Sequence, residues 1–188
     1  AEPFDLRQKG ATCIMDKRKV ANQQVKDRLL TALLEFAGEK DLSQVKVTEL
    51  VERSGVARAS FYRNFNSVED IVEYGIQHMA DLYHESKPAS GEGFRSREMV
   101  LYKFRFYQKY AEIVLAFHRA HVSTSLLDII TDCEIDESGD MPAHSIARYE
   151  LYYFAGAFYN MLIYWLETGM RETPEAMTDE FLRIAKRG

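Results

Sequence analysis

The chain has 188 residues, 46% of them hydrophobic and 28% charged, which suits a packed core in one domain or in a small and a larger one. Two cysteines are too few for a disulfide framework or a four-thiolate zinc site, and no run of about 18 apolar residues predicts a membrane span. The net charge of −5 combines −1 over residues 1–16, +4 over residues 17–65 and −8 over residues 66–188, an asymmetry expected when one end meets a polyanion.

Residues 1–19 predict a flexible N-terminal arm that lacks the apolar segment of a secretory signal, so we expect a cytoplasmic protein. The basic run Lys17-Arg18-Lys19 is either an arm that touches DNA or a solvated terminus. From residue 20 onward, apolar residues recur at helical spacing and no alternating strand pattern is found, so we expect an all-α fold. The predicted helices are 20–38, 47–53, 57–64, 67–84, 97–119, 122–134, 143–168 and 174–186.

Residues 46–65 predict a helix-turn-helix, in which the second short helix can enter the major groove of DNA. Gly55 can adopt the positive φ that the tight turn needs, and Val56 can fill the angle between the helices. Burial of Phe61 and Phe65 leaves the polar residues of the second helix facing outward, where they either contact DNA or form a solvated surface. Those outward residues are Arg58, Ser60, Tyr62, Arg63 and Asn64.

Residues 24–72 resemble the N-terminal domain of the tetracycline-repressor (TetR) family. The similarity rests on Leu34-Glu35-Phe36-Ala37, Val47-Thr48-Glu49-Leu50-Val51, Ser54-Gly55-Val56 and Ser60-Phe61-Tyr62-Arg63-Asn64-Phe65, followed by Ser67 and Glu69-Asp70-Ile71. The run from Ala155 to Glu175 is similar to the branch of regulators found near dihydroxyacetone-kinase operons.

The resemblance implies a homodimer that binds a near-palindromic double-stranded DNA operator, represses in the free state and is released by a small-molecule effector of unknown identity. Tyr62 matches the tyrosine that contacts phosphate, and Arg58 and Ser60 match positions that face bases or nearby phosphates. Thr48 lies at the start of a helix, where contacts to the DNA backbone are common. Lys46 replaces the usual Thr or Ser, so a helix cap is lost and a phosphate contact is gained.

Residues 20–66 therefore predict the DNA-binding domain, and residues 67–188 a helical ligand-binding and dimerisation domain. Aromatic and apolar side chains line ligand pockets, although they also fill ordinary cores. His118 and His121 are one helical turn apart but lack further metal ligands, so neither a metal nor a cofactor is expected. The candidate ligand-binding residues are Tyr107, Tyr110, Phe117, His118, His121, Tyr153, Phe154, Phe158 and Met161.

The segment 149–166 carries apolar or aromatic side chains nearly all round, so other helices must cover it on several sides. One side can meet a twofold-related copy, with Ala155-Gly156-Ala157 allowing close approach, and the alternative is a central helix buried within a monomer. The candidate dimer-interface residues are Tyr152, Gly156, Tyr159, Ile163, Phe181 and Ile184.

The sequence contains no Gly-rich phosphate loop, no serine nucleophile elbow and no pair of Glu-x-x-His motifs, so we do not expect an enzyme. We expect a ligand-responsive, DNA-binding transcriptional regulator. The alternative is a helix-turn-helix-like adaptor or co-activator that acts through a protein partner, and a steep salt dependence of DNA affinity distinguishes the two.

Overall fold

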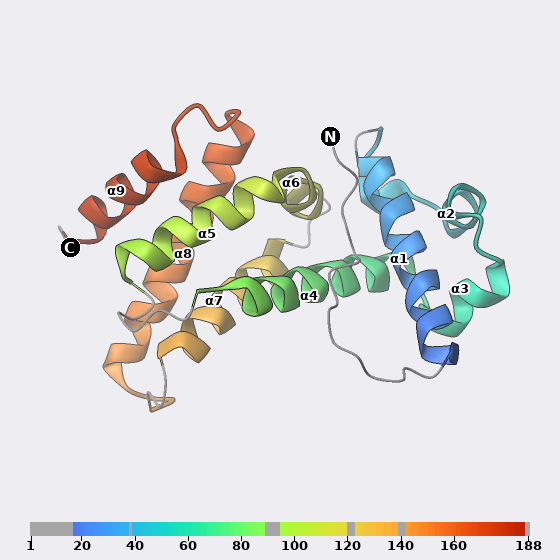
Figure 1. Cartoon of the computed structure of the whole chain (residues 1–188), viewed down its shortest axis with the longest axis horizontal. Coiled ribbons are helices and arrows are strands. Elements are labelled where there is room, and N and C mark those ends of the chain that lie inside the picture. Colours follow the sequence, from blue (N-terminus) through green and yellow to red (C-terminus); the bar gives the residue numbers. More distant parts are fainter. Residues whose placement is uncertain (1–16, 38, 89–94, 120–122, 139–141, 187–188) are drawn as a thin grey trace. The chain divides into compact units, whose positions relative to one another are not determined.

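The computed structural model describes residues 17–37, 39–88, 95–119, 123–138 and 142–186, and every regular element within these ranges is a helix (Figure 1). The expected all-α fold is therefore confirmed. The chain divides into two compact units, residues 1–75 and 76–188. This division falls inside α4 (Val68–Ser86), whereas the sequence places it at the start of that helix. Residues 1–16 of the predicted arm lie outside the described residues, as does His121.

The N-terminal unit contains α1 (Lys17–Ala37), η1 (Leu42–Gln44), α2 (Val47–Ser54), α3 (Arg58–Asn64) and the first turns of α4. Helix α1 begins three residues earlier than predicted, so the backbone of residues 17–19 is helical. The 3-10 turn η1 was not predicted, and it forms because the Asp41 carboxylate accepts a hydrogen bond from the Ser43 N–H.

Helix α1 packs against both α2 and α3, which gives this small unit its core. The apolar stripe predicted for α1 is buried because its members recur every three or four residues and face the same side. The buried residues of this core include Leu29, Leu30, Leu33 and Phe36 of α1, Leu50 of α2, Phe61 of α3 and Ile71 of α4.

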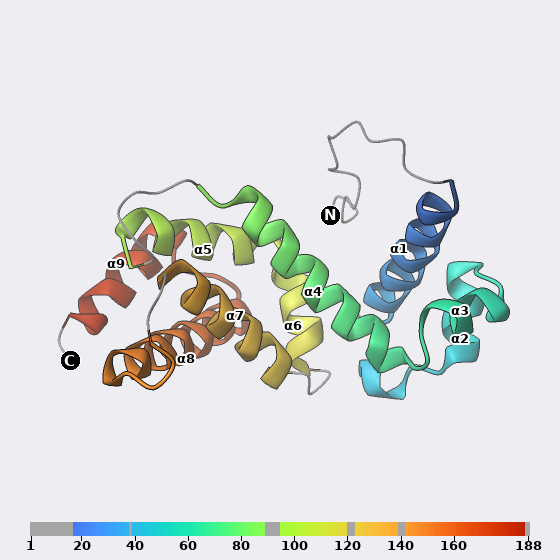
Figure 2. The same cartoon turned by 90° about the horizontal axis from the view of Figure 1, so that it is seen from below.

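The C-terminal unit contains α5 (Arg97–Lys109), α6 (Ala111–Arg119), α7 (Ser123–Ser138), α8 (Ile146–Glu167) and α9 (Pro174–Ala185). Figures 1 and 2 show α5 beside α9 and α7 beside α8, and these two pairs make extensive contacts. The sequence predicts one helix over 97–119, but the structure ends α5 at Lys109 and starts α6 at Ala111. The Tyr110 backbone leaves helical geometry there without any Gly or Pro, so no local signal marked the break.

The predicted end of α8 at Gly169 is confirmed. Gly169 has φ +85°, and its N–H donates to the Leu166 carbonyl at 3.2 Å. The Met170 N–H donates to the Trp165 carbonyl at 2.9 Å, which completes a Schellman motif. Glycine suits this position because a left-handed backbone costs it no steric clash.

Aromatic rings fill the centre of the C-terminal unit. The Phe104 ring lies 5.0 Å from Phe158 and 5.6 Å from Trp165, measured between centroids, and Phe158 lies 5.7 Å from Phe181. Beside these rings, Lys103 of α5 and Glu134 of α7 form a fully buried ion pair. A charged pair in such a place needs its mutual attraction, because each ion by itself loses its hydration on burial.

Candidate nucleic-acid interface

The turn between α2 and α3 has the geometry that the sequence predicts for a helix-turn-helix. Gly55 has φ +62°, and Val56 is buried between the helices. The Arg28 guanidinium of α1 donates to the Ser54 carbonyl at 2.6 Å, which satisfies a backbone acceptor at the end of α2. The positive φ favours glycine at position 55, whereas a Cβ there would meet only Arg28 Nη2, at 2.8 Å, the far end of a flexible side chain.

Helix α3 has one buried and one exposed side. The Phe61 side chain is 0% exposed and Phe65 is buried, as expected, whereas 50% of Tyr62 is exposed. Arg58, one helical turn before Tyr62, is also exposed, and its Nη2 lies 3.5 Å from the Tyr62 hydroxyl oxygen. Arg58 and Tyr62 therefore share a face, and Arg63 is exposed beside them.

Ser60 and Asn64 are half-buried rather than fully outward. The Asn64 side-chain amide donates to the Ser60 carbonyl at 2.8 Å, so it is bonded to its own helix. In this conformation Asn64 is less available to a base edge than Arg58 is, because its Nδ2 already has an acceptor.

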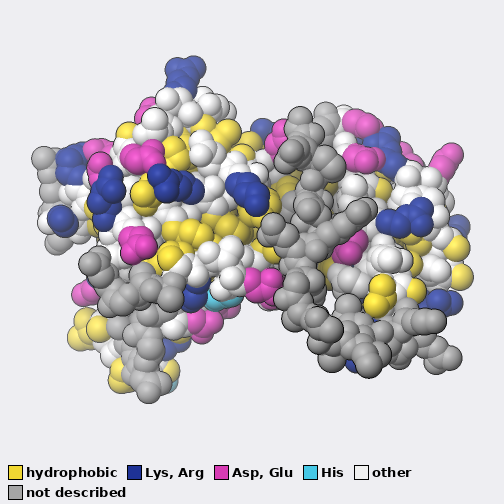
Figure 3. All heavy atoms as spheres, in the orientation of Figure 1, with side chains coloured by type: hydrophobic (Ala, Val, Ile, Leu, Met, Phe, Trp, Pro, Cys, Tyr) yellow, Lys and Arg dark blue, Asp and Glu magenta, His cyan; other side chains and the backbone are white. Residues whose placement is uncertain are grey.

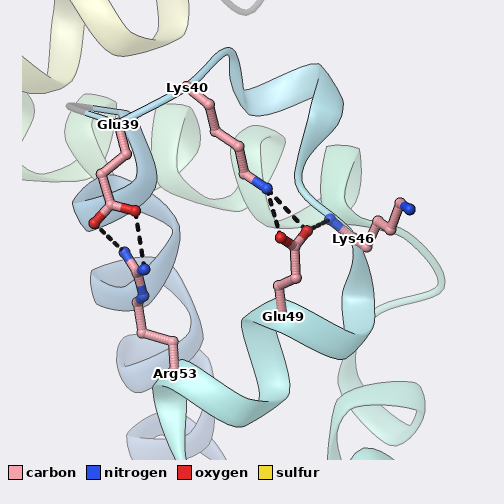
Figure 4. A network of polar contacts seen from close by, with 5 residues as sticks. All are labelled: Glu39, Lys40, Lys46, Glu49 and Arg53. Carbon is pink, nitrogen blue, oxygen red and sulfur yellow. Dashed lines mark hydrogen bonds and ion pairs between the residues drawn. The ribbon is translucent and has the colours of Figure 1, made fainter.

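Two of the predicted residues, Lys46 and Thr48, are exposed at the start of α2. No Lys46 side-chain cap forms, as the sequence predicts, because an ammonium group has no acceptor. Instead the Lys46 N–H donates to Glu49 Oε2 at 3.0 Å, and Figure 4 shows the Lys46 side chain extending away from that carboxylate. The Lys46 ammonium is thus separated from the acid that caps its own helix.

Two ion pairs fasten the segment between α1 and α2 (Figure 4). Lys40 Nζ lies 2.8 Å from Glu49 Oε1, and Arg53 Nη1 lies 2.6 Å from Glu39 Oε1, with the Arg53 guanidinium 3.6 Å above the centre of the Phe36 ring. The bond from Lys40 holds the pKa of Glu49 below its usual value, and the bond from Arg53 does the same for the pKa of Glu39. Both carboxylates therefore stay ionised to lower pH than an unpaired glutamate does.

Between residues 39 and 65, these pairs separate the basic residues into two groups. Lys40 and Arg53 are bound to carboxylates, whereas Lys46, Arg58 and Arg63 show no ion pair in the part of the chain that the structure describes. Figure 3 shows Lys and Arg side chains at the surface of the N-terminal unit, together with acidic ones. The second group leaves three cationic side chains exposed on the surface of the unit.

The contact of Arg28 and the two ion pairs were not predicted from the sequence. Arg28 lies 26 positions before its acceptor Ser54, and Arg53 lies 14 positions after its partner Glu39. Such separations exceed the three or four residues over which helical spacing predicts side-chain pairs. One local signal pointed to Arg53: it lies in the last turn of α2, where the helix dipole favours a cation.

The predicted ligand-binding residues do not all come together. Tyr107, Phe117, Phe154 and Phe158 are buried, and Tyr110 and Met161 are partly buried. His118 Nδ1 lies 2.8 Å from the hydroxyl oxygen of the buried Tyr159. Tyr153, by contrast, is exposed on the surface of α8. Among the described residues, no group of His, Cys, Asp and Glu is arranged to hold a metal ion.

The predicted dimer residues are divided in the same way. Tyr159, Ile163 and Phe181 are buried in the core of their own chain, because they pack with the aromatic cluster around Phe158. Tyr152 and Ile184 are exposed, and Gly156 is half-exposed, with nothing within 4 Å of a Cβ placed on it. None of the helices in the described ranges is long and apolar enough to cross a membrane.

Two family models match the chain. The model described as bacterial regulatory proteins of the tetR family matches residues 29–74, and the model described as a transcriptional regulator C-terminal region matches residues 97–187. The two ranges together make up well over half of the sequence. No curated protein matches it significantly.

Solved structures share the fold. A TetR transcriptional regulator from Streptococcus agalactiae is 15% identical with a TM-score of 0.66, covering 89% of this chain and 97% of its own. A protein from Listeria innocua is 16% identical with a TM-score of 0.71, covering 94% and 95%. A TetR-family regulator from Syntrophomonas wolfei is 16% identical with a TM-score of 0.68, covering 88% and 94%. At these identities the similarity concerns the fold.

Proposed function

We propose that this chain, which belongs to the tetR family of bacterial regulatory proteins, binds a palindromic operator as a dimer. It releases the operator when a small molecule binds. Members of this family are transcriptional regulators and not enzymes, in agreement with the expectation from sequence. The observation that carries the proposal is the exposed face of α3, where Arg58 and Tyr62 lie one turn apart above a buried Phe61.

Each side chain of this face suits one kind of DNA contact. A guanidinium can donate two hydrogen bonds to the major-groove edge of guanine, which makes Arg58 the candidate for reading sequence. The Tyr62 hydroxyl can donate to a phosphate oxygen, and the Lys46 ammonium can neutralise one. We propose that the protein represses and releases its operator in the cytoplasm. The alternative, an adaptor that binds only a protein partner, gives no reason for DNA-contacting side chains on the exposed face of α3.

Replacement of Arg58 by Ala is expected to weaken operator binding by about 1–3 kcal/mol and to relax the preference for one base, because a bidentate contact is lost. Duplexes selected from a random-sequence pool would serve as the operator, with affinity measured by fluorescence anisotropy at several salt concentrations. Arg183→Ala, in which an exposed arginine of α9 is removed, is the matched control and should bind normally. Equal affinities for the two variants, or binding that does not depend on salt, would contradict the proposal.

For the dimer, we propose an interface on the exposed side of α8. Four large apolar residues lie there at helical spacing: Ile146 (86% exposed), Tyr149 (74%), Tyr153 (63%) and Tyr164 (71%). Gly156, half-exposed on the same helix, leaves space for close approach of a second helix. Large apolar side chains on one face of a helix are costly to leave in water, which supports cover by a second copy of the chain.

Replacement of Tyr153 by Asp is expected to raise the dimer dissociation constant at least about thirtyfold, because an uncompensated charge replaces a ring at the centre of the stripe. Sedimentation equilibrium measures this constant directly. Tyr62→Asp changes a comparably exposed tyrosine of α3 and should leave the dimer intact. A monomeric wild-type protein, or a Tyr153→Asp variant as dimeric as the wild type, would refute this interface.

The effector is proposed to bind among the helices of the C-terminal unit, where Tyr107, Phe154 and Phe158 are gathered. Within the family, the similarity of residues 155–175 to the dihydroxyacetone-kinase-regulator-like branch supports placing the chain there. A thermal-shift screen of metabolites, followed by DNA release by each positive compound, tests whether the unit binds a small molecule.

A further inference from the structure

A chain of ring contacts links α4 to the exposed face of α3. The Tyr74 ring of α4 lies in a T-shaped contact with Phe65, with 5.7 Å between centroids. Phe65 lies 6.4 Å from Phe61, and Phe61 makes a T-shaped contact with Tyr62 at 5.1 Å. Closely packed rings transmit a displacement to their neighbours. A shift of the Tyr74 ring is therefore expected to move Phe65 and, through Phe61, Tyr62.

The other end of Tyr74 is tied to α1. Its hydroxyl donates to Asp27 Oδ1 at 3.1 Å, and the Gln23 side-chain amide donates to the same oxygen at 2.7 Å and also bonds to the Tyr74 hydroxyl. The Lys26 ammonium lies 5.3 Å from the centre of the Tyr74 ring and 5.8 Å from that of Phe65. Gln23, Lys26, Asp27 and Tyr74 are all half-buried. Hydrogen bonds in such a place are stronger than those fully exposed to water, so they fix the side chains more firmly.

We propose that Tyr74 is a positioning residue for DNA recognition: its hydroxyl fixes α4 on Asp27 of α1, and its ring fixes Phe65, so that α3 is held at the angle that DNA requires. Helix α4 continues beyond Gly75 into the C-terminal unit, and Tyr74 lies in its last turn within the N-terminal unit. The inference rests on the proposed function only in taking α3 as the DNA-reading helix.

The first test is Tyr74→Phe, which keeps the ring and removes the hydroxyl. We expect operator affinity to fall roughly three- to tenfold, the change that the loss of one net hydrogen bond produces when it lowers the population of the binding-competent state. Amide hydrogen exchange without DNA should quicken in residues 58–64 of α3 and stay unchanged in α2. Gln23→Ala should act in the same direction, and Gln24→Ala, an exposed neighbour on α1, should have no effect.

A double-mutant cycle separates positioning from general stability. If the hydroxyl acts through Asp27, most of the effect of Tyr74→Phe on affinity disappears in an Asp27→Ala background, whereas independent effects would add. Unchanged exchange in α3, equal acceleration in α1, α2 and α3, or additive effects would each overturn the inference. If the wild-type protein binds no duplex DNA, the proposed function fails, and the exchange experiment still decides whether Tyr74 holds α3.

Discussion

Replacing Lys103 with Met is expected to lower the free energy of unfolding of the C-terminal unit by about 3–5 kcal/mol. Lys103 and Glu134 are both buried and form an ion pair between α5 and α7. Removal of the lysine leaves the Glu134 carboxylate buried without this counter-ion, which costs more than the pair itself contributes. The double variant Lys103→Met/Glu134→Leu should recover most of the loss, because it removes both charges and keeps the volume apolar.

Urea unfolding followed by tryptophan fluorescence measures this effect in the correct unit, because Trp165 is the one tryptophan of the sequence and is buried beside Phe104. Arg105→Met is the matched control on the same helix. Arg105 pairs with Glu175 at 2.6 Å, but both side chains are exposed, so water screens the pair and its loss should matter far less. A double variant less stable than either single variant would show that the charges themselves are required.

Replacing Phe61 with Ala is expected to destabilise the N-terminal unit by about 3–5 kcal/mol, because the fully buried ring leaves a cavity between α1 and α3. The neighbouring change Tyr62→Ala should alter stability by less than about 1 kcal/mol, since half of that side chain is already in water. Its DNA affinity should nevertheless fall roughly ten- to a hundredfold if the hydroxyl bonds to a phosphate.

Amide exchange in residues 29–37 and 47–64 reports the stability of this unit, and anisotropy with the selected duplex reports DNA affinity. The pair of variants therefore separates folding from recognition at two adjacent positions of one helix. If Tyr62→Ala binds DNA like the wild type, the exposed face of α3 is not the contact surface. If Phe61→Ala is as stable as the wild type, the Phe61 ring does not stabilise the core of the N-terminal unit.

Local patterns in the sequence predict most of the helices and the helix-turn-helix. The stripe of α1, the turn at Gly55 and the end of α8 at Gly169 follow from helical spacing and from glycine's freedom at positive φ, and the structure confirms all three. The break at Tyr110 was missed because nothing in its own sequence interrupts a helix. The sequence also did not predict which side of α8 is buried and which is exposed. A segment that is apolar all round does not reveal which rings its own chain buries.

Helical spacing was enough to predict the all-α fold, the helix-turn-helix and the outward placement of Arg58 and Tyr62, because each depends on residues within a few turns of one another. Which side chains far apart in the chain meet depends on how the helices pack. Arg28 with Ser54, Lys103 with Glu134 and Tyr74 with Asp27 are brought together by the packing of separate helices. No periodicity records such contacts, since many polar residues on a helix surface have the same spacing and few acquire a partner.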